Sequence, residues 1–352
     1  MKNRFVQLFA GVALLFGLAS CGEWTETESI GLADTDIETQ NPELYARYVE
    51  NLNRYKQSAH KIVYATFDNS VKEPANRSHY MSLVPDSIDM VELEYPDGLV
   101  PREVEEIETL HSLGTKVLFR VAFETVEANY EAYLAAWNEA NPEPGEGVSP
   151  LAFVDFMRDE LEAKLSLFDR YNYDGVTIRY VGMDYLFLKP AELAVYTERQ
   201  TFFLDTFKNW KAANPGRLLI FEGQPHTLVD KSYTQEYDYL ILDSSEDESL
   251  ATLTYHLQKA MCEGVPTDRF LAATSTTSLD PQDVTTGYFS NSGSSDPIEA
   301  LPLVAQWTAC EHLGVMPAGM VIRRVQNDYF QMNHSYGRVR KAIDTINPSP
   351  KY

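Results

Sequence analysis

The sequence predicts an α/β fold in which eight parallel strands close into a single-domain (β/α)8 TIM barrel. Along the 352 residues, eight short apolar segments alternate with segments of helical length, at about the spacing that such a barrel requires. The segment at 116–123 is apolar almost throughout, which is typical of a parallel strand covered on both faces. An open doubly wound sheet is the alternative, and eight regular units in one chain favour closure.

The first half of the chain supplies four strands and four helices. Asn41-Pro42 begins a helix with apolar residues on one face, and Gly114 follows a helix as a C-cap signal. An apolar helical segment leads into the turn at Asp174-Gly175, after which side chains alternate with strand periodicity. We therefore expect helices at 42–57, 101–112, 124–137 and 150–171, and strands at 61–67, 87–93, 116–123 and 176–181.

The second half repeats the pattern. Asn214-Pro215-Gly216 closes one helix, and Gly264 and Gly314 each follow another. The segment at 275–297 is rich in Ser, Thr and Gly and is expected to be a loop. We expect helices at 190–213, 250–262, 298–313 and 335–346, and strands at 217–222, 237–242, 270–274 and 319–325.

The first twenty residues have the pattern of a bacterial export signal. Lys2 and Arg4 precede an apolar run at 5–18, and small residues then lead to Cys21. This order predicts a lipoprotein signal peptide at 1–20, with Cys21 as the lipidated first residue of the mature chain. The run is too short to remain as a membrane-spanning helix. A cleaved secretory signal with an incidental cysteine is the alternative.

Residues 21–41 are polar and acidic, and we expect them to form a flexible tether before a barrel at 42–352. The acidic stretch after Cys21 resembles the surface-export signal of Bacteroidetes lipoproteins, which implies the cell surface of the outer membrane. The formal net charge of −23 repels phosphate backbones and argues against nucleic acid as a partner.

Other sites of common chemistry find little support. His226 has no second ligand at metal-binding spacing, and no Gly-rich phosphate loop or Gly-x-Ser-x-Gly motif occurs. No cofactor is therefore expected. Cys262 and Cys310 fall in predicted helices and are expected to be buried free thiols, with a disulfide as the alternative.

The fourth strand carries the most informative motif. Its sequence after Asp174-Gly175 resembles the fourth strand of glycoside hydrolase family 18, the chitinase and endo-β-N-acetylglucosaminidase family, which reads Asp-Gly-x-Asp-x-Asp-x-Glu. The two family aspartates fall on Thr177 and Arg179, and the catalytic glutamate falls on Val181. Strand eight also resembles the family's Gly-Val-Met-x-Trp ending, without the aromatic residue that floors the sugar pocket. The resemblance implies a TIM barrel whose catalytic carboxylates are absent.

The residues at these three positions affect the family's cleavage chemistry. The family cleaves with one carboxylic acid as proton donor, while the substrate's acetamido group acts as the nucleophile. Valine has no proton to give, and an arginine guanidinium stays protonated near neutral pH. The resemblance therefore implies a sugar-binding barrel without catalytic residues.

Ligands of TIM barrels bind at the carboxyl ends of the strands. Those positions carry amides, carboxylates and aromatic rings, which suit sugar hydroxyls and sugar ring faces. The expected glycan-binding residues are Asp184, Tyr185, Glu222, Gln224, Asp243, Asn327 and Tyr329.

Several of these residues also have a structural interpretation. A buried Arg179 needs an acid, and the structural interpretation is that Glu222, Asp243 or Glu124 serves only as its ion-pair partner. Phe67 and Phe123 are expected in the core. Tyr130, Tyr133 and Trp137 have helical spacing and are expected to seal their helix onto the barrel.

Three functions are consistent with these observations. The first is a surface glycan-binding lipoprotein that holds N-acetylglucosamine-containing glycans, including N-glycans, for a TonB-dependent importer and a separate glycosidase. The second is an active endo-β-N-acetylglucosaminidase whose displaced acid is Glu222, Glu124 or Asp243. The third is a structural subunit that binds another protein, which an exposed apolar patch on the outer helices would favour.

Overall fold

The computed structural model describes residues 37–143, 145–290, 297–330 and 334–348. The predicted signal peptide, Cys21 and most of the predicted tether lie outside the described residues. The chain divides into two units, residues 1–50 and 51–352. The first contains α2 (Ile37–Gln40) and most of α3 (Pro42–Lys56), so its described part is largely helical up to the unit boundary.

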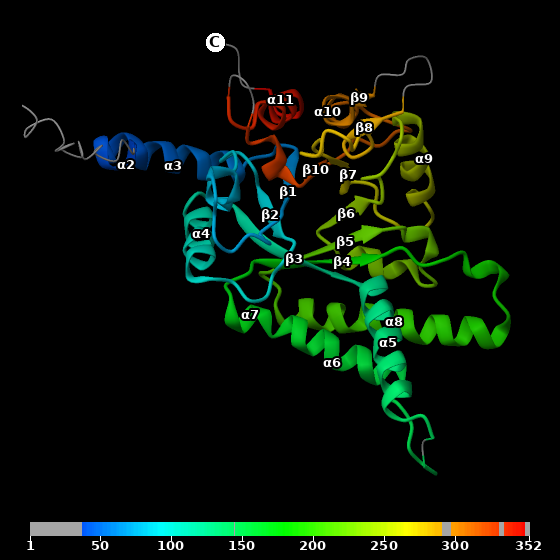
Figure 1. The fold of residues 1–352 in the computed structure, drawn as a ribbon. Helices are drawn as coiled ribbons and strands as arrows, with labels where there is room; N and C mark the ends of the chain where they lie inside the picture. Colours follow the sequence, from blue (N-terminus) through cyan, green and yellow to red (C-terminus); the bar gives the residue numbers. More distant parts are fainter. Residues whose placement is uncertain (1–36, 144, 291–296, 331–333, 349–352) are drawn as a thin grey trace, which may run out of the picture. The chain divides into compact units, whose positions relative to one another are not determined.

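The second unit contains a closed barrel of eight parallel strands, which confirms the predicted fold and excludes the open sheet (Figure 1). The strands follow one another around the barrel in chain order, and β1 pairs with β10 to close it. They are β1 (Ile62–Phe67), β2 (Met90–Leu93), β3 (Lys116–Ala122), β4 (Gly175–Tyr180), β5 (Leu218–Gly223), β6 (Tyr239–Leu242), β7 (Phe270–Ser275) and β10 (Gly319–Arg323).

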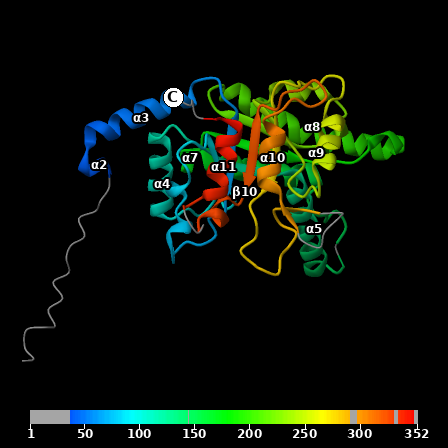
Figure 2. The same ribbon diagram turned by 90° about the horizontal axis from the view of Figure 1, so that it is seen from above.

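Helices surround the barrel, and several match their predicted bounds. Figure 2 shows α10 and α11 lying next to β10 on one flank of the barrel. The helices of this unit are α4 (Pro101–Ser112), α5 (Phe123–Ala140), α6 (Phe153–Leu165), α7 (Leu167–Arg170), α8 (Pro190–Ala213), α9 (Leu250–Ala260), α10 (Ala300–Thr308) and α11 (Gly337–Ile346).

Several predicted helices differ from the structure, and α5, for example, extends three residues beyond its expected end at 137. The helix expected at 150–171 divides into α6 and α7 at Ser166, whose hydroxyl donates to the carbonyl of Ala163. The helix expected at 250–262 ends at Ala260. In place of the helix expected at 298–313, the structure has the shorter α10. It begins at Ala300 because residues 298–299 form a strand, and it ends at Thr308.

That short strand pairs with a second one that lies within the segment 275–297, which was expected to be a loop. β8 (Tyr288–Phe289) pairs antiparallel with β9 (Ile298–Glu299). Two-residue strands carry too few alternating positions for a sequence pattern to reveal them.

Side chains alternate between the barrel interior and the helical shell. The interior layer comprises Tyr64, Met90, Leu118, Ile220, Ile241, Leu271, Ala273 and Val321. Val176, Ile178 and Tyr180 of β4 instead pack in the larger core. Thr177, on the other face of β4, is fully buried and lies 2.8 Å from the Tyr64 hydroxyl. The set containing Thr177 and Arg179 therefore faces the barrel interior.

The cysteines are free, as expected, but neither is buried within a helix. Cys262 follows α9 and is half-buried, and Cys310 follows α10 and is exposed. Both helices end two residues before the cysteine, which leaves the thiols in surface turns. Among the described residues, no helix is long and apolar enough to cross a membrane.

Candidate functional site

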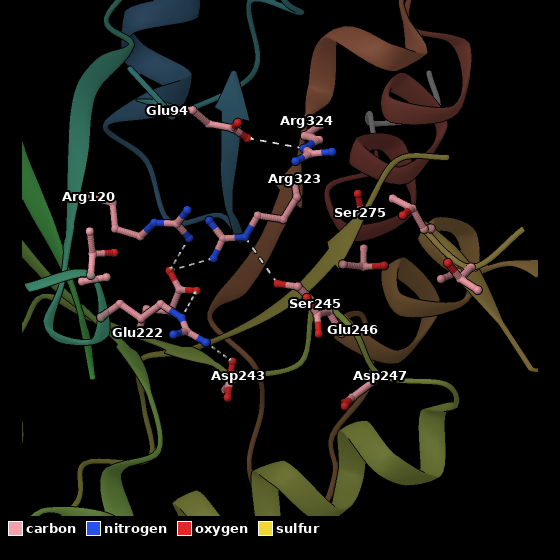
Figure 3. A pocket seen from close by; sticks show the side chains of 18 of the residues that line it. Glu94, Arg120, Glu222, Asp243, Ser245, Glu246, Asp247, Ser275, Arg323 and Arg324 are labelled. Carbon is pink, nitrogen blue, oxygen red and sulfur yellow. Dashed lines mark hydrogen bonds and ion pairs between the residues drawn. The ribbon is translucent and has the colours of Figure 1, made fainter. Parts of the chain in front are cut away.

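A large cavity opens at the carboxyl ends of the barrel strands. Its volume is about 1400 Å³. Pockets for drug-sized ligands span about 300–1,000 Å³, so this cavity has room for a larger ligand. Figure 3 shows the side chains around it, with Glu222 between Arg120 and Asp243, and with Glu94 and Arg324 opposite Asp243 and Asp247.

A cluster of charged side chains forms the floor of this cavity. Glu222 forms ion pairs with Arg323, whose Nη2 lies 2.9 Å away, and with Arg120, whose Nη1 lies 3.4 Å away (Figure 3). Glu92 lies deeper, with Oε1 3.5 Å from Arg323 and 3.7 Å from Arg120. The hydroxyl of Tyr64 donates to the other oxygen of Glu92. The deepest carboxylates thus lie between two guanidinium groups.

Arg179 completes the cluster and contacts all three acids that the sequence proposed for it. Its guanidinium nitrogens lie 3.2 Å from Glu124, 3.5 Å from Glu222 and 3.3 Å from Asp243. The predicted pairing is confirmed, but Arg179 is not buried in the core. Its side chain is 28% exposed, because the end of β4 reaches the cavity. Three guanidinium groups face four carboxylates here, which leaves the cluster close to neutral.

The arginines decide the ionisation of Glu222. Burial by itself would raise its pKa, but the charges of Arg323, Arg120 and Arg179 outweigh burial and hold the pKa below the ordinary value. A carboxyl group with a lowered pKa is ionised near neutral pH and has no proton to donate. Glu222 therefore suits an ion pair better than general acid catalysis.

Val181 follows β4 directly and contacts the carboxylate of Glu124. The backbone N–H of Val181 donates to Glu124 Oε1 at 2.6 Å, while Glu124 Oε2 accepts from Arg179 at 3.2 Å. Asp243 is also held at both oxygens, because Arg179 contacts Oδ1 and Gln224 donates to Oδ2 at 3.3 Å. Neither carboxylate offers an oxygen that is free of these contacts.

The cavity mouth contains a residue with unusual backbone geometry. Arg324 has φ 52°, in the left-handed region. Its N–H donates to the Thr66 hydroxyl at 2.8 Å, and its carbonyl accepts from the Thr276 hydroxyl at 2.7 Å. Its side chain is 56% exposed and lies 3.8 Å from Glu94 (Figure 3). Burial is the largest effect on Glu94 and raises its pKa.

The β8–β9 hairpin supplies aromatic surface to the cavity. Tyr288 is half-buried and Phe289 is buried, and both line the cavity. Aromatic faces pack on the C–H faces of sugars, so Tyr288 offers a platform that the sequence did not single out.

The expected glycan-binding residues occupy three different places. Glu222 and Asp243 line the large cavity. Asp243 also lines a smaller cavity of about 210 Å³, together with Gln224. The other four contact neighbouring rim segments and line neither cavity, and they are Asp184, Tyr185, Asn327 and Tyr329.

The contacts of these four residues have a structural role. Asp184 accepts from the N–H of Leu186 at 3.1 Å and caps the short helix η3 (Tyr185–Phe187). Tyr185 stacks on Tyr196, and Asn327 donates to the carbonyl of Thr277 at 3.4 Å. Tyr329 packs edge-on against Tyr336.

The structural interpretation of the aromatic residues is largely confirmed. Phe67 and Phe123 are buried in the core. Tyr130 stacks on Tyr133, and both contact Phe156, so α5 is sealed against α6. No group of residues that could hold a metal ion occurs within the described parts of the chain.

Sequence reasoning missed Glu92, Arg120 and Arg323. Each lies inside a predicted strand, whereas the search for ligand-binding residues began where the strands were expected to end. A charged residue within an otherwise apolar strand was the available signal, since such a charge needs partners from neighbouring strands.

Comparison with known proteins agrees with this architecture. The model of the family "Glycoside hydrolase family 18, BT1044-like" matches residues 25–345. A solved variant of BT1044 has a TM-score of 0.60 and 17% identity, over 88% of this chain and 95% of that chain. An apo endo-β-N-acetylglucosaminidase from Cordyceps militaris has a TM-score of 0.59 and 16% identity, over 86% of this chain and 96% of that chain.

A chitinase catalytic domain from Ostrinia furnacalis has a TM-score of 0.51 and 10% identity, over 84% of this chain and 98% of that chain. No curated protein matches the sequence. At these identities the solved structures establish a shared fold, while the family model spans most of the sequence itself. The chain therefore belongs to glycoside hydrolase family 18, in the BT1044-like group.

Proposed function

We propose that this protein is a surface lipoprotein that binds N-acetylglucosamine-containing glycans in the large cavity and does not cleave them. The observation that carries the proposal is the position of Arg179. It stands where the family motif has an aspartate, and it pairs with Glu124, Glu222 and Asp243 together. The charges of Arg323, Arg120 and Arg179 hold the pKa of Glu222 below its ordinary value and favour its ionised form, whereas hydrolysis needs a protonated acid.

The same contacts weigh against the displaced-acid enzyme. Each of its three candidate acids, Glu222, Glu124 and Asp243, has both carboxylate oxygens in contact with a donor or a guanidinium group. A general acid needs to reach the leaving oxygen of the substrate with its own proton. None of these contacts hinders binding, because binding requires only hydrogen-bonding groups and an aromatic surface.

The ligand class is inferred from the family and its structural neighbours. A mutant of the Cordyceps militaris endo-β-N-acetylglucosaminidase was solved in complex with fucosyl-N-acetylglucosamine-Asn, at a TM-score of 0.56 to this chain. We extend the N-acetylglucosamine-containing class to this protein. A TonB-dependent importer and a separate glycosidase are the proposed partners, since a protein that only holds a glycan needs others to cut and import it.

The most exposed apolar side chains do not favour the structural-subunit alternative. The two most exposed large apolar side chains among the described residues are Leu186 and Phe187, at 76% and 86%. They lie in the loop after β4, at the ligand-binding end of the barrel, and not on the outer helices.

A glycan-array screen of the purified protein, paired with mass spectrometry of each bound glycan, tests the proposal. We expect retention of N-acetylglucosamine-containing glycans with unchanged mass. Failure to retain any glycan would refute the binding function, and shortened products would favour the enzyme.

Replacing Tyr288 by alanine should weaken glycan binding about tenfold, because it removes the aromatic face at the cavity wall. Isothermal titration calorimetry with a glycan selected on the array measures the change. Tyr288→Phe is the matched control and should retain most of the affinity, because it keeps the ring. The sequence also predicts weaker binding for Tyr185→Ala and Tyr329→Ala. These two variants test whether the glycan contacts the rim outside the cavity. Unchanged affinity of Tyr288→Ala would show that the glycan does not contact this wall.

Cys21→Ala should abolish lipidation and surface display, because the thiol of this residue is the expected attachment point. Labelling of intact cells with a membrane-impermeant reagent measures display, and Cys310→Ala serves as the control. Equal surface labelling of Cys21→Ala and the unmodified protein would contradict a lipid anchor at this position.

A further inference from the structure

A second, smaller cavity adjoins the large one. Its volume is about 210 Å³, and it lies between the ends of β5 and β6, the short helix η4 (Pro225–Thr227) and α9. Asp243 and His256 line both cavities. The two cavities therefore meet at Asp243 and His256.

The backbone at this junction depends on Gly223, the last residue of β5. It has φ 136°, and a Cβ atom there would collide with the carbonyl of Tyr180. This conformation, which side-chain-bearing residues rarely adopt, turns the chain from β5 into η4 and forms one wall of the side cavity.

Nitrogen-bearing side chains line the side cavity in a protein that is strongly acidic overall. Lys259 is exposed and makes no ion pair with a carboxylate within the described parts of the chain, and its Nζ lies 5.7 Å from the centroid of the Tyr255 ring. His226 has a buried Nδ1 without a hydrogen-bond partner among those same residues. Burial lowers the pKa of His226, so its ring is neutral near pH 7.

His256 adds a titratable donor at the junction of the cavities. Its Nδ1 lies 3.1 Å from Oδ1 of Asp247, whose side chain is only 5% exposed. The adjacent Asp247 carboxylate raises the pKa of His256. Protonation therefore begins at a higher pH than for an ordinary histidine.

The acids near the side cavity are already engaged. Asp243 is the only carboxylate that lines it among the described residues, and Arg179 and Gln224 hold its two oxygens. Asp247 pairs with His256, and Asp184 caps η3. Lys231, the other cation near His226, donates to the carbonyl of Leu228 at 3.0 Å. Among the described residues neither lysine pairs with a carboxylate, and only Lys259 lines the side cavity.

We propose that the side cavity is a subsite for an anionic sugar residue, one that carries a carboxylate or a sulfate group. The Tyr255 ring offers a face for the sugar, while Lys259 and His256 offer donors for its anionic group. This inference rests on the proposed function, because the large cavity must hold the rest of the same glycan.

Paired oligosaccharides test the subsite by isothermal titration calorimetry on the purified protein. The probes are N-acetylglucosamine-containing oligosaccharides that differ only in the terminal residue, which is a hexose, a hexuronic acid or a sulfated hexose. We expect at least one acidic member to bind about tenfold more tightly than the neutral one, because a charge-assisted hydrogen bond is stronger than a neutral one. The two acidic arms distinguish a carboxylate site from a sulfate site.

Lys259→Met should reduce the acidic-to-neutral affinity ratio to about one, while Lys341→Met on α11 should leave the ratio unchanged. The ratio should grow as the pH falls through the raised pKa of His256, and His256→Gln should remove this growth. Equal affinity for all three probes, or a preference that survives Lys259→Met, would overturn the subsite while leaving the proposed function intact. If no probe binds, the proposed function fails and the subsite fails with it.

Discussion

The unmodified protein should return an N-acetylglucosamine-containing glycan uncut after prolonged incubation, and Val181→Glu alone should not restore cleavage. A general acid contributes about 10²–10⁴-fold to rate, and the aspartate positions at 177 and 179 are lost as well. A glutamate at 181 would also enter a site where Glu124 already contacts the backbone and Arg179 holds the neighbouring carboxylates. Chromatography of released reducing-end sugar measures the outcome.

The informative comparison combines Val181→Glu with Thr177→Asp and Arg179→Asp. This triple variant restores the acidic positions of the motif, so any activity that appears only there would assign the defect to those residues. A second comparison addresses the rival enzyme. Release of sugar by the unmodified protein that Glu222→Gln abolishes would replace the binding function with a displaced-acid hydrolase.

Glu222→Gln should lower the free energy of unfolding by about 3–5 kcal/mol, the usual cost of removing one partner of a buried ion pair. Glu222 is 5% exposed at its side chain and lies between Arg120, Arg179 and Arg323. Without its charge, Arg120, Arg179 and Arg323 would surround a neutral amide and keep only Glu92, Glu124 and Asp243 as partners. Chemical denaturation monitored by circular dichroism measures the loss, and Glu139→Gln on the exposed surface of α5 is the control.

Arg179→Met should cost less than Glu222→Gln. Arg120 and Arg323 would still pair with Glu222, and the side chains of Asp243 and Glu124 are 27% and 34% exposed, so water can solvate them. A larger loss for Arg179→Met than for Glu222→Gln would show that the cluster depends on Arg179 instead.

The contribution of Glu222 should also depend on pH in a defined direction. Its folded-state pKa lies below the ordinary value, so its stabilising effect is complete above the ordinary carboxyl range and is lost as the pH falls through the folded pKa. The stability difference between the unmodified protein and Glu222→Gln should therefore be largest near neutral pH and shrink in acid. A difference that stays constant into strong acid would contradict an ionised Glu222.

The local sequence determined the barrel and the altered motif. Apolar strands such as β3 and helices with clear caps such as α4 are specified by short-range patterns, and both bounds of α4 were predicted. The presence of Thr177, Arg179 and Val181 after Asp174-Gly175 is likewise a fact of the sequence, and so is the need of an interior Arg179 for an acid.

Only the tertiary structure decided how the charges are shared and where the cavity lies. Arg179 and Glu222 are neighbours in the register of β4 and β5, but Glu92, Arg120 and Arg323 join them from three other strands. Closure of the barrel brings these residues together across long sequence separations, and no local pattern encodes that proximity. The same closure left Tyr329 packed beside the mouth and brought Tyr288 to the cavity wall, because side-chain direction at a rim depends on how each loop folds onto its neighbours.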